Sequence, residues 1–353
     1  MTSSPSTAAI APASIRDARQ AWNAARFRPE AAQQGVGHYE SWFQRANHPT
    51  EPRAFWIRYT IFAPDEGEAL GELWAIWFDA TGPSPRIVAV REAHPLGDCT
   101  FSPHGLDAQV QLSTLREGAL QGQASHDGHT VAWDLTYASA EAPLLMLPEA
   151  RYASGFPKAK ALVGAPLARF DGTLAVDGQQ VAIDGWLGSQ NHNWGRQHTD
   201  DYAWGQVAGF DDAPDAFLEC ATARVRVGPA PLRVWSPRFT MVNLRVAGET
   251  YALNGLWKGA TASGRYRFFR WAFDSRQAGV RIRGTIEAPR EAFVGLTYGN
   301  PPGGTKTCLN SKIASCTLTL TRPDHPPLEL RTQNRAAFEI LTDRTNHGVP
   351  ILT

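Results

Sequence analysis

Short runs in which apolar residues occupy every second position recur along the whole chain. In "AFWIRYTIFAP", alternate residues from Phe55 to Ile61 share one face of an extended backbone, and Trp56, Arg58 and Thr60 share the other. This period of two is typical of a β-strand. "GELWAIWFDATG" follows after an acidic turn that contains glycine, so the two runs predict a hairpin in a barrel wall.

Strand patterns dominate the rest of the chain, with glycine and proline between them. The 31 glycines and 25 prolines separate short apolar runs, which favours many short strands. The other predicted strands lie in "DAQVQLST", "HTVAWDLTYAS", "GTLAVDGQQVAIDGWLG", "DYAWGQVAGF", "DAFLECATARVRV", "FTMVNLRVAG", "RYRFFRWAF", "VRIRGTIEA", "AFVGLTYG", "SCTLTLTR" and "PLELRT". The Asp-Gly pair in the third of these predicts a tight hairpin turn, because both residues readily take positive φ angles.

Two stretches predict helices. "SIRDARQAWNAAR" near the start has Ser14 as a candidate N-cap, and "RAAFEILTDR" near the end has Asn334. Each helix would have about three turns. The pattern therefore predicts an all-β protein with a short N-terminal helix and a C-terminal helix.

The arrangement of the strands favours two β units. Many antiparallel strands with little helix are typical of barrels, sandwiches or a propeller, and the absence of a blade-length repeat argues against the propeller. "FPKAKALVGAPLARFDG" is rich in small residues and proline, and it predicts a crossover near residue 170. We therefore expect an extension over residues 1–30, one lipocalin-like β-barrel over 31–170 and a second over 171–353.

Charge and hydropathy narrow the partners of the protein. The 34 basic residues balance 34 acidic ones, so no long-range field would attract nucleic acid or an anionic membrane surface. The start of the chain lacks the basic and apolar regions of a signal peptide, and no apolar run reaches the roughly 18 residues of a membrane span. We expect a soluble, cytoplasmic protein with no integral membrane segment.

The cysteines and histidines do not form a metal-binding pattern. The four cysteines are Cys99, Cys220, Cys308 and Cys316. They are too few and too scattered for a disulfide scaffold or a zinc ribbon, which predicts buried, reduced thiols. His198 follows His192 by six residues, a spacing that fits ligands neither on a helix nor on a strand. We expect no metal and no cofactor.

One stretch, "DYAWGQVAGF", combines bulky polar and aromatic residues with small ones. One face of the predicted strand carries Tyr202, Trp204, Gln206, Ala208 and Phe210, and the other carries Ala203, Gly205, Val207 and Gly209. This pattern favours a strand whose small side lies against another element and whose bulky side lines a cavity. The alternative is an aromatic core in which the glutamine finds a hydrogen-bond partner.

Just before it, "NHNWG" predicts a second part of the same site. His192 and Trp194 are two residues apart, so they share a face if the backbone is extended. A turn between the two stretches would place their strands side by side. We therefore predict that His192, Trp194, Trp204 and Gln206 project into one cavity.

Polar groups also gather among aromatic residues in "GHYESWF". His38, Glu40 and Trp42 alternate onto one face, so an imidazole and a carboxylate lie beside an indole. This arrangement predicts an acid site in the first barrel. The alternative is a barrel rim with a solvated Glu40 and a half-buried His38.

Four segments together resemble a known family. The longest is "FPKAKALVGAPLARFDGTLAVDGQQVAIDGWLGSQNHNWGRQHTDDYAWGQVAGF", and the others are "GHYESWFQRANHPTEPRAFWIRYTIF", "YGNPPGGTKTCLNSKIASCTLTLTR" and "NRAAFEIL". They resemble the AttH-like branch of the calycin superfamily, which includes the carotenoid 1,2-hydratases (hydroxyneurosporene synthases) and the tocopherol cyclases. The "HNWG" and "AWGQ" motifs are the most specific. The resemblance implies a pair of lipocalin-like β-barrels; function carries over less directly.

The resemblance also implies candidate chemistry. Carotenoid hydratases hydrate a terminal alkene with a His-x-Trp pair, which His192 and Trp194 match, and with a nearby Tyr-x-Asp pair. Where that second pair should stand, this chain has "AFLECATAR", in which Glu219 is the only acid. A buried Glu219 with a raised pKa could protonate an alkene. The alternative is a structural ion pair with an arginine such as Arg224 or Arg270.

Other enzyme classes lack their local signatures. The chain has no GxSxG elbow, HExxH helix, P-loop or GxGxxG turn after a strand, which argues against hydrolase triads, zincins, nucleotide hydrolases and dinucleotide-binding enzymes. Paired carboxylates for glycoside hydrolysis stay open, because their separation depends on the fold.

Two functions follow from these observations. The first is a cofactor-independent enzyme that hydrates, cyclises or rearranges a hydrophobic isoprenoid, polyene or polyketide in a pocket between two barrels. The second is a non-catalytic, lipocalin-like carrier of a small hydrophobic ligand. An acid that lines an enclosed pocket with a raised pKa and no arginine partner would favour the enzyme; paired or solvated acids would favour the carrier.

Overall fold

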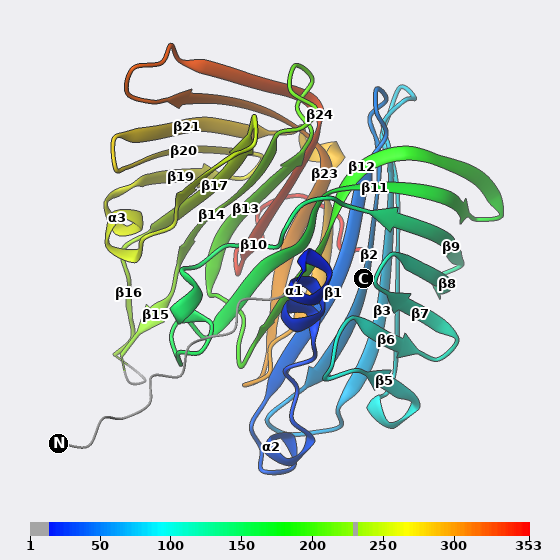
Figure 1. The fold of residues 1–353 in the computed structure, drawn as a ribbon. Coiled ribbons are helices and arrows are strands. Elements are labelled where there is room, and N and C mark those ends of the chain that lie inside the picture. The colour runs from blue at the N-terminus through cyan, green and yellow to red at the C-terminus, as the bar shows by residue number, and fades with distance from the viewer. Residues whose placement is uncertain (1–13, 229–231) are drawn as a thin grey trace.

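The computed structural model describes residues 14–228 and 232–353, so the first thirteen residues of the predicted extension lie outside it. Antiparallel strands make up most of the fold (Figure 1). The described helices are α1 (Ile15–Asn23), α2 (Pro29–Gln33) and α3 (Leu256–Thr261), with single 3-10 turns at Leu96–Asp98, Glu149–Arg151 and Arg290–Ala292. The helix α1 begins as predicted, because the Ser14 hydroxyl accepts a hydrogen bond from the backbone N–H of Asp17.

The first half of the chain builds one large sheet. Its strands are β1 (His38–Asn47), β2 (Arg53–Ala63), β3 (Leu70–Asp79), β4 (Arg86–Pro95), β5 (Cys99–Phe101), β6 (Asp107–Val110), β7 (Ser113–Arg116), β8 (Ala119–His126), β9 (His129–Ala138), β10 (Leu144–Leu145), β11 (Ala159–Val176) and β12 (Gln179–Gly195). The order is β4-β3-β2-β1-β12-β11-β9-β8-β7-β6-β5, with β10 beside β11. The predicted β2–β3 hairpin is present. So is the Asp-Gly turn between β11 and β12, where Asp177 and Gly178 both have positive φ.

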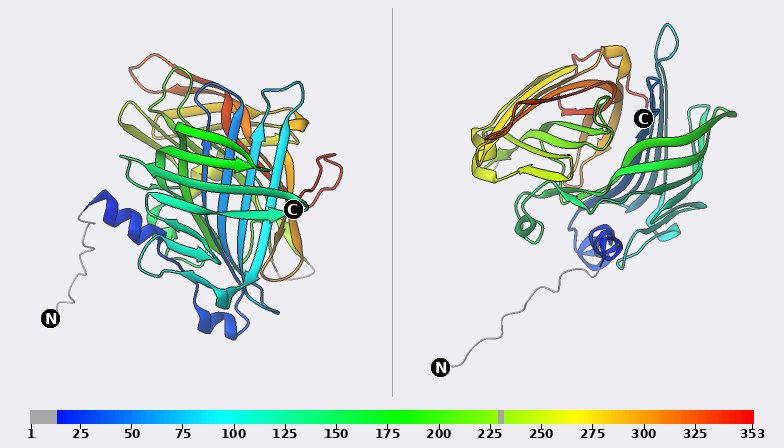
Figure 2. Two further views of the ribbon diagram at one scale, coloured as in Figure 1. Left: turned by 90° about the vertical axis from the view of Figure 1, so that its right-hand side faces the viewer. Right: turned by 45° about the horizontal axis from the view of Figure 1, so that its top comes forward.

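The second half builds another antiparallel sheet. Its strands are β13 (Asp201–Ala208), β14 (Phe217–Arg224), β17 (Phe239–Val246), β18 (Glu249–Leu253), β19 (Ser263–Arg267), β20 (Arg270–Gln277), β21 (Val280–Glu287), β22 (Val294–Gly299), β23 (Thr305–Thr321) and β24 (Leu328–Thr342). The order is β18-β17-β14-β13-β24-β23-β21-β20-β19, with β22 beside β23. A separate pair is formed by β15 (Arg226–Val227) and β16 (Val234–Trp235). In Figure 2 the second sheet curls into a nearly closed barrel, whereas the first is strongly curved but more open.

The predicted C-terminal helix is wrong, because "RAAFEILTDR" forms the end of β24. There β24 pairs with β13 on one side and β23 on the other. Ala336, Phe338 and Ile340 fill the second barrel, while Glu339 and Leu341 point away from it and are also buried. Burial on both faces hides the period of two, and pairing on both edges overrides the helical preference of the residues.

The chain changes sheets later than the predicted crossover near residue 170. The segment expected to be the crossover forms most of β11, and β12 continues the first sheet to Gly195 by pairing with β1. The small residues of "VGAPLA" accommodate β-bulges around Ala165 and Ala168, which interrupt the strand pattern without ending the strand.

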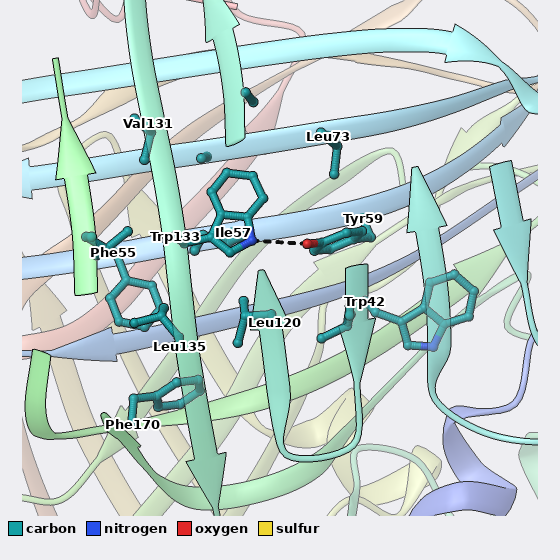
Figure 3. Close-up of a cluster of buried hydrophobic side chains, with 14 of the residues drawn as sticks. Trp42, Phe55, Ile57, Tyr59, Leu73, Leu120, Val131, Trp133, Leu135 and Phe170 are labelled. Carbon is teal, nitrogen blue, oxygen red and sulfur yellow. Dashed lines mark hydrogen bonds between the residues drawn. The ribbon is translucent and has the colours of Figure 1, made fainter. Parts of the chain in front are cut away.

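Buried apolar side chains form three main clusters. One fills the concave side of the first sheet and includes Trp42, Ile57 and Phe170 (Figure 3). In its centre the indole N–H of Trp133 donates to the hydroxyl of Tyr59 over 3.1 Å. The second cluster fills the second barrel.

The third cluster joins the two sheets through their outer faces. It contains Phe43, Trp56 and Trp74 from the first sheet, and Leu296 and Tyr298 from the second. Polar and charged side chains continue the same contact, so the two β units share one interface. The candidate site lies within it.

Candidate functional site

A cavity of about 210 Å³ lies between the two sheets. Its walls come from β1, β2, β11 and β12 on one side and from β13, β14, β17, β22 and β24 on the other. Aromatic side chains make up much of the lining: Phe43, Trp56, Tyr202, Trp204, Phe239 and Tyr298. An adjoining pocket of about 270 Å³, which shares Phe156 and Val225 with the cavity, lies next to it.

The strand β13 presents two residues of its predicted bulky face to this cavity, whereas Phe210, which was predicted for the same face, packs in the core of the second barrel. Tyr202 and Trp204 line the cavity, and Ala203 and Val207 point into the core of the second barrel. A Cβ at Gly205 would collide with Ile286, so the glycine lets the barrel core pack directly against the strand. The cavity therefore lies outside the second barrel, against the first sheet.

Glu219, on β14, is the carboxylate of this cavity with the clearest acid–base character. It is 2% exposed and accepts hydrogen bonds over 2.8 Å from the indole N–H of Trp204 and from the side-chain amide of Gln206. Burial raises the pKa of Glu219 to about 7, although these two hydrogen bonds and the charge of Arg45 pull the pKa down. The acid is thus poised to exchange a proton near neutral pH.

The alternative of an arginine ion pair is wrong for Glu219. Arg224 pairs with Asp201 over 2.6 Å, and Arg270 pairs with Glu287 over 2.8 Å. Glu219 itself forms no ion pair in the described parts of the chain. The indole and amide donors therefore hold the carboxyl group without a neutralising partner in contact.

Gln206 does not line the cavity, but it holds the Glu219 carboxyl group by a hydrogen bond from the side away from the cavity. Its amide nitrogen donates to Glu219 and to the side chain of Asn191, both over 2.8 Å. Its amide oxygen accepts from Arg45 Nε and from the Ser189 hydroxyl, both over 2.7 Å. Because a guanidinium can only donate, this arrangement sets the orientation of the amide and connects the charge of Arg45 to Glu219.

A second buried carboxylate, Glu339, borders the same cavity. Its Oε1 accepts from Lys312 Nζ over 2.8 Å and from Asn310 over 2.9 Å. Lys312 also lies 5.5 Å from the centre of the Trp204 ring. Burial lowers the pKa of Lys312, and the contact with Glu339 opposes that shift. The ion pair thus supports one side of Trp204.

The other predicted acid, Glu40, lies on the concave face of the first sheet. It is fully buried, and its two oxygens accept from the backbone N–H groups of Arg26 and Phe27 over 2.7 to 2.9 Å. The Nε2 atom of His38 lies 3.0 Å from Glu40 Oε2, and the Nε2 atom of His192 lies 2.8 Å from Glu40 Oε1. Burial alone would raise the pKa of Glu40, but the hydrogen bonds from His192 and His38 lower it to about 2.

His192 and Trp42 complete this inner cluster and hold the end of α1. The Nδ1 atom of His192 lies 2.8 Å from the carbonyl oxygen of Trp22, which can only accept a hydrogen bond. Trp42 stacks on the His192 ring and donates its indole N–H to the carbonyl of Asn23. These contacts favour a structural role for the inner cluster, which fastens the N-terminal helix across the sheet.

The structure does not bring His192, Trp194, Trp204 and Gln206 into one cavity, so that prediction is wrong. His192 borders the cavity, but both its ring nitrogens are engaged on the concave side. Trp194 contacts Tyr152 and lies under the guanidinium of Arg26. Gln206 instead contacts Ser189 and Asn191 of β12. These two residues face the opposite side of the strand from His192 and Trp194, because successive residues of a strand point in opposite directions.

The sequence reasoning missed four charged or titratable residues of the interface. They are Arg45, Arg58, Lys312 and Glu339. Arg58 did carry a signal: it occupies the second face of a strand that is apolar on both sides. His198, set aside because its spacing suits no metal, stacks between Tyr39 and Tyr298 at the cavity wall.

The described residues show no arrangement for a metal. They contain no group of three or more histidine, cysteine, aspartate or glutamate side chains that could hold an ion. All four cysteines are unpaired, and three of them are buried. None of the described helices is both long and apolar enough to span a membrane.

Geometry and fold together define a class: a double β-sheet protein of lipocalin-like type with an acid-bearing cavity between its sheets. No family model matches the sequence. Two curated relatives, uncharacterized proteins from two strains of Mycobacterium tuberculosis, are each 26% identical over 291 residues, which is 81% of this chain and 82% of theirs.

Solved structures share the fold. A candidate AttH protein from Nitrosomonas europaea superposes with a TM-score of 0.53 at 13% identity, covering 90% of this chain and 96% of its own. Kievitone hydratase from Nectria haematococca superposes with a TM-score of 0.51 at 11% sequence identity, and the match covers 91% of this chain and 97% of the hydratase. CghA superposes with a TM-score of 0.50 at 12% sequence identity, and the match covers 88% of this chain and 89% of CghA. The protein thus has the lipocalin-like fold of AttH-type proteins, as its sequence motifs implied.

Proposed function

We propose that the protein is a cofactor-independent enzyme that protonates an apolar, unsaturated molecule bound between its two sheets. The substrate class is an isoprenoid, polyene or polyketide, and the reaction is a hydration, a cyclisation or a related rearrangement. The observation that carries the proposal is Glu219, a buried carboxyl group at the wall of an aromatic cavity. Its pKa is raised to about 7, and it forms no ion pair with an arginine in the part of the chain that the structure describes. A shared fold with a protein named as a hydratase agrees with it.

In the proposed reaction Glu219 supplies the proton. The carboxyl O–H bond breaks as a new C–H bond forms at one carbon of the alkene, which leaves a carbocation on the other carbon and a carboxylate on Glu219. The electron-rich face of Trp204 stabilises the cation. In a hydration, water then attacks the cation and returns a proton to Glu219. In a cyclisation, a second double bond of the substrate attacks instead, and loss of a proton restores the acid.

Gln206 and Trp204 have positioning roles in this reaction. Both donate hydrogen bonds to Glu219, and such bonds stabilise the carboxylate that forms when the proton leaves. His192 and Glu40 have no step in it, because each is saturated by partners on the far side of the sheet. Trp194, His38 and Trp42 lie with them and support the first sheet.

The test begins with the ligand. Protein purified from its native host is extracted, and the extract is examined by mass spectrometry for an unsaturated apolar molecule. We expect Glu219→Gln, which is nearly isosteric, to bind this molecule normally and to lower its turnover by about 10² to 10⁴. Glu291→Gln, which alters an exposed carboxylate paired with Arg290, is the matched control.

Two results would contradict the enzyme. If wild-type protein returns the molecule unchanged under all conditions, the non-catalytic carrier is the correct function. If Glu219→Gln turns the substrate over at the wild-type rate, the protein is an enzyme but Glu219 is not its acid.

A further inference from the structure

Arg58, on β2, is a buried cation at the wall of the cavity. Its side chain is 5% exposed, and within residues 14–228 and 232–353 it forms no ion pair and no hydrogen bond; its Nε is fully enclosed. Guanidinium groups are permanently charged, and burying one without a partner is costly. Buried charged groups without a protein partner are therefore candidates for a functional site.

Aromatic rings hold Arg58 in place without neutralising it. The guanidinium carbon lies 4.7 Å from the ring centre of Tyr298, 5.8 Å from that of Trp74 and 5.9 Å from that of Trp56. These contacts attract the cation to the ring faces and fix the plane of the guanidinium. They leave its N–H donors available, because a ring face accepts no strong hydrogen bond.

The acids near this wall are engaged elsewhere. Glu72 accepts from Arg91 over 2.5 Å and from the indole of Trp74. Glu339 is paired with Lys312. Burial and the charge of Arg58 lower the pKa of the adjacent His198 to about 3, so this ring stays neutral and adds no competing charge. Among the described residues, Arg58 and Lys160 are cavity cations without an ion pair. Lys160 donates a hydrogen bond to the carbonyl oxygen of Arg151 over 2.7 Å, whereas Arg58 has neither an anion nor a hydrogen-bond acceptor from the described protein.

We propose that Arg58 binds an anionic oxygen group of the ligand, so that the substrate is an apolar molecule with a carboxylate or an equivalent oxyanion. This inference rests on the proposed use of the cavity and narrows the substrate class. The apolar body lies against Trp56 and Trp204, and the anion accepts hydrogen bonds from the guanidinium, a geometry that suits carboxylates. Such an anchor fixes which carbon of the ligand reaches Glu219.

The experiment compares two molecules that differ only in charge. N-phenyl-1-naphthylamine, a neutral fluorescent probe, is bound to the full-length protein at about pH 6 and displaced by dodecanoate or by its neutral isostere dodecanamide. Carboxylic acids are ionised at this pH. We expect dodecanoate to displace the probe from wild-type protein at about tenfold lower concentration than dodecanamide.

Substitutions then locate the preference. In Arg58→Met, dodecanoate and dodecanamide should displace the probe at similar concentrations. Arg58→Lys should keep part of the preference for dodecanoate. Arg331→Met, which removes an exposed arginine paired with Glu329, is the control for net charge and should behave as wild type. Since Arg58 has no hydrogen-bond or ion-pair partner among the described residues, Arg58→Met should also melt at the same temperature as wild type or higher. If it does not fold, Arg58→Gln carries the same comparison.

The outcomes separate this inference from the proposed function. Equal displacement by both compounds in the wild type, or a dodecanoate preference that survives Arg58→Met, overturns the anion site. Loss of thermal stability in Arg58→Met together with an unchanged preference assigns Arg58 a structural role instead. Trp204→Ala should weaken the binding of the neutral probe. If it does not, the cavity holds no apolar ligand, and the proposed function fails as well.

Discussion

Two buried glutamates on neighbouring sheets have opposite acid–base character. Glu40 receives four donors, two of them backbone N–H groups from the segment after α1, and its pKa falls to about 2. Glu219 receives two neutral side-chain donors, and its pKa rises to about 7. Burial opposes ionisation in both, so the number and charge of the donors decide the outcome. Glu40 therefore stays ionised over most of the pH range, whereas Glu219 can exchange a proton near neutral pH.

The largest effect on stability should come from Glu40. Glu40→Gln removes the charge that pairs with the two histidines and turns an amide N–H₂ toward backbone donors, so it should cost about 3 to 5 kcal/mol. Glu219→Gln should cost nothing or stabilise the protein at neutral pH, because both of its partners can still donate to an amide oxygen and the substitution removes a buried carboxyl group whose pKa is raised to about 7. Urea denaturation at neutral pH measures both. Equal losses for the two variants would refute the division between a structural and a chemical carboxylate.

The pH dependence of stability should differ in sign between the two acids. An ordinary glutamate titrates near 4.5. Because the folded pKa of Glu40 lies below that value, its contribution is complete above about pH 4.5 and is lost as the pH falls toward 2. Because the folded pKa of Glu219 lies above it, Glu219 destabilises the fold progressively as the pH rises from 4.5 to about 7.

Glu219→Gln isolates the second of these windows. At roughly 1.4 kcal/mol per pKa unit, the variant should gain about 3 kcal/mol relative to wild type between pH 4.5 and 7. Denaturation curves of both proteins across this range give the difference. A constant difference at every pH would show that Glu219 has an ordinary pKa in the folded protein.

A smaller effect should come from Arg45, which acts on Glu219 through Gln206. Arg45 is fully buried, and burial lowers its own pKa to about 9, while its charge lowers the pKa of Glu219. Arg45→Met should therefore raise the pKa of Glu219 and move the loss of kcat/KM at high pH to a higher pH. Arg331→Met is again the control. A variant that is merely less stable would lose activity without moving the profile, so an unmoved profile contradicts this role.

The local sequence predicted much of this molecule, where neighbouring residues decide the outcome. Alternation identified β2 and β3, Asp-Gly identified the turn between β11 and β12, and Ser14 identified the start of α1. Each of these depends on a few adjacent residues and their own φ and ψ preferences. The sequence also pointed to Glu219 as an acid in an apolar strand.

Long-range contacts decided the rest. The last strand looked like a helix because partners on both edges and both faces bury it, which removes the alternation from its sequence. The predicted site residues lie on two faces because β12 contacts Gln206 of the second sheet through Ser189 and Asn191, which point to the opposite side of the strand from His192. The fates of Glu40 and Glu219 depend on donors that lie far away in sequence or on a neighbouring strand, and a pKa is set by what the fold brings within hydrogen-bonding distance.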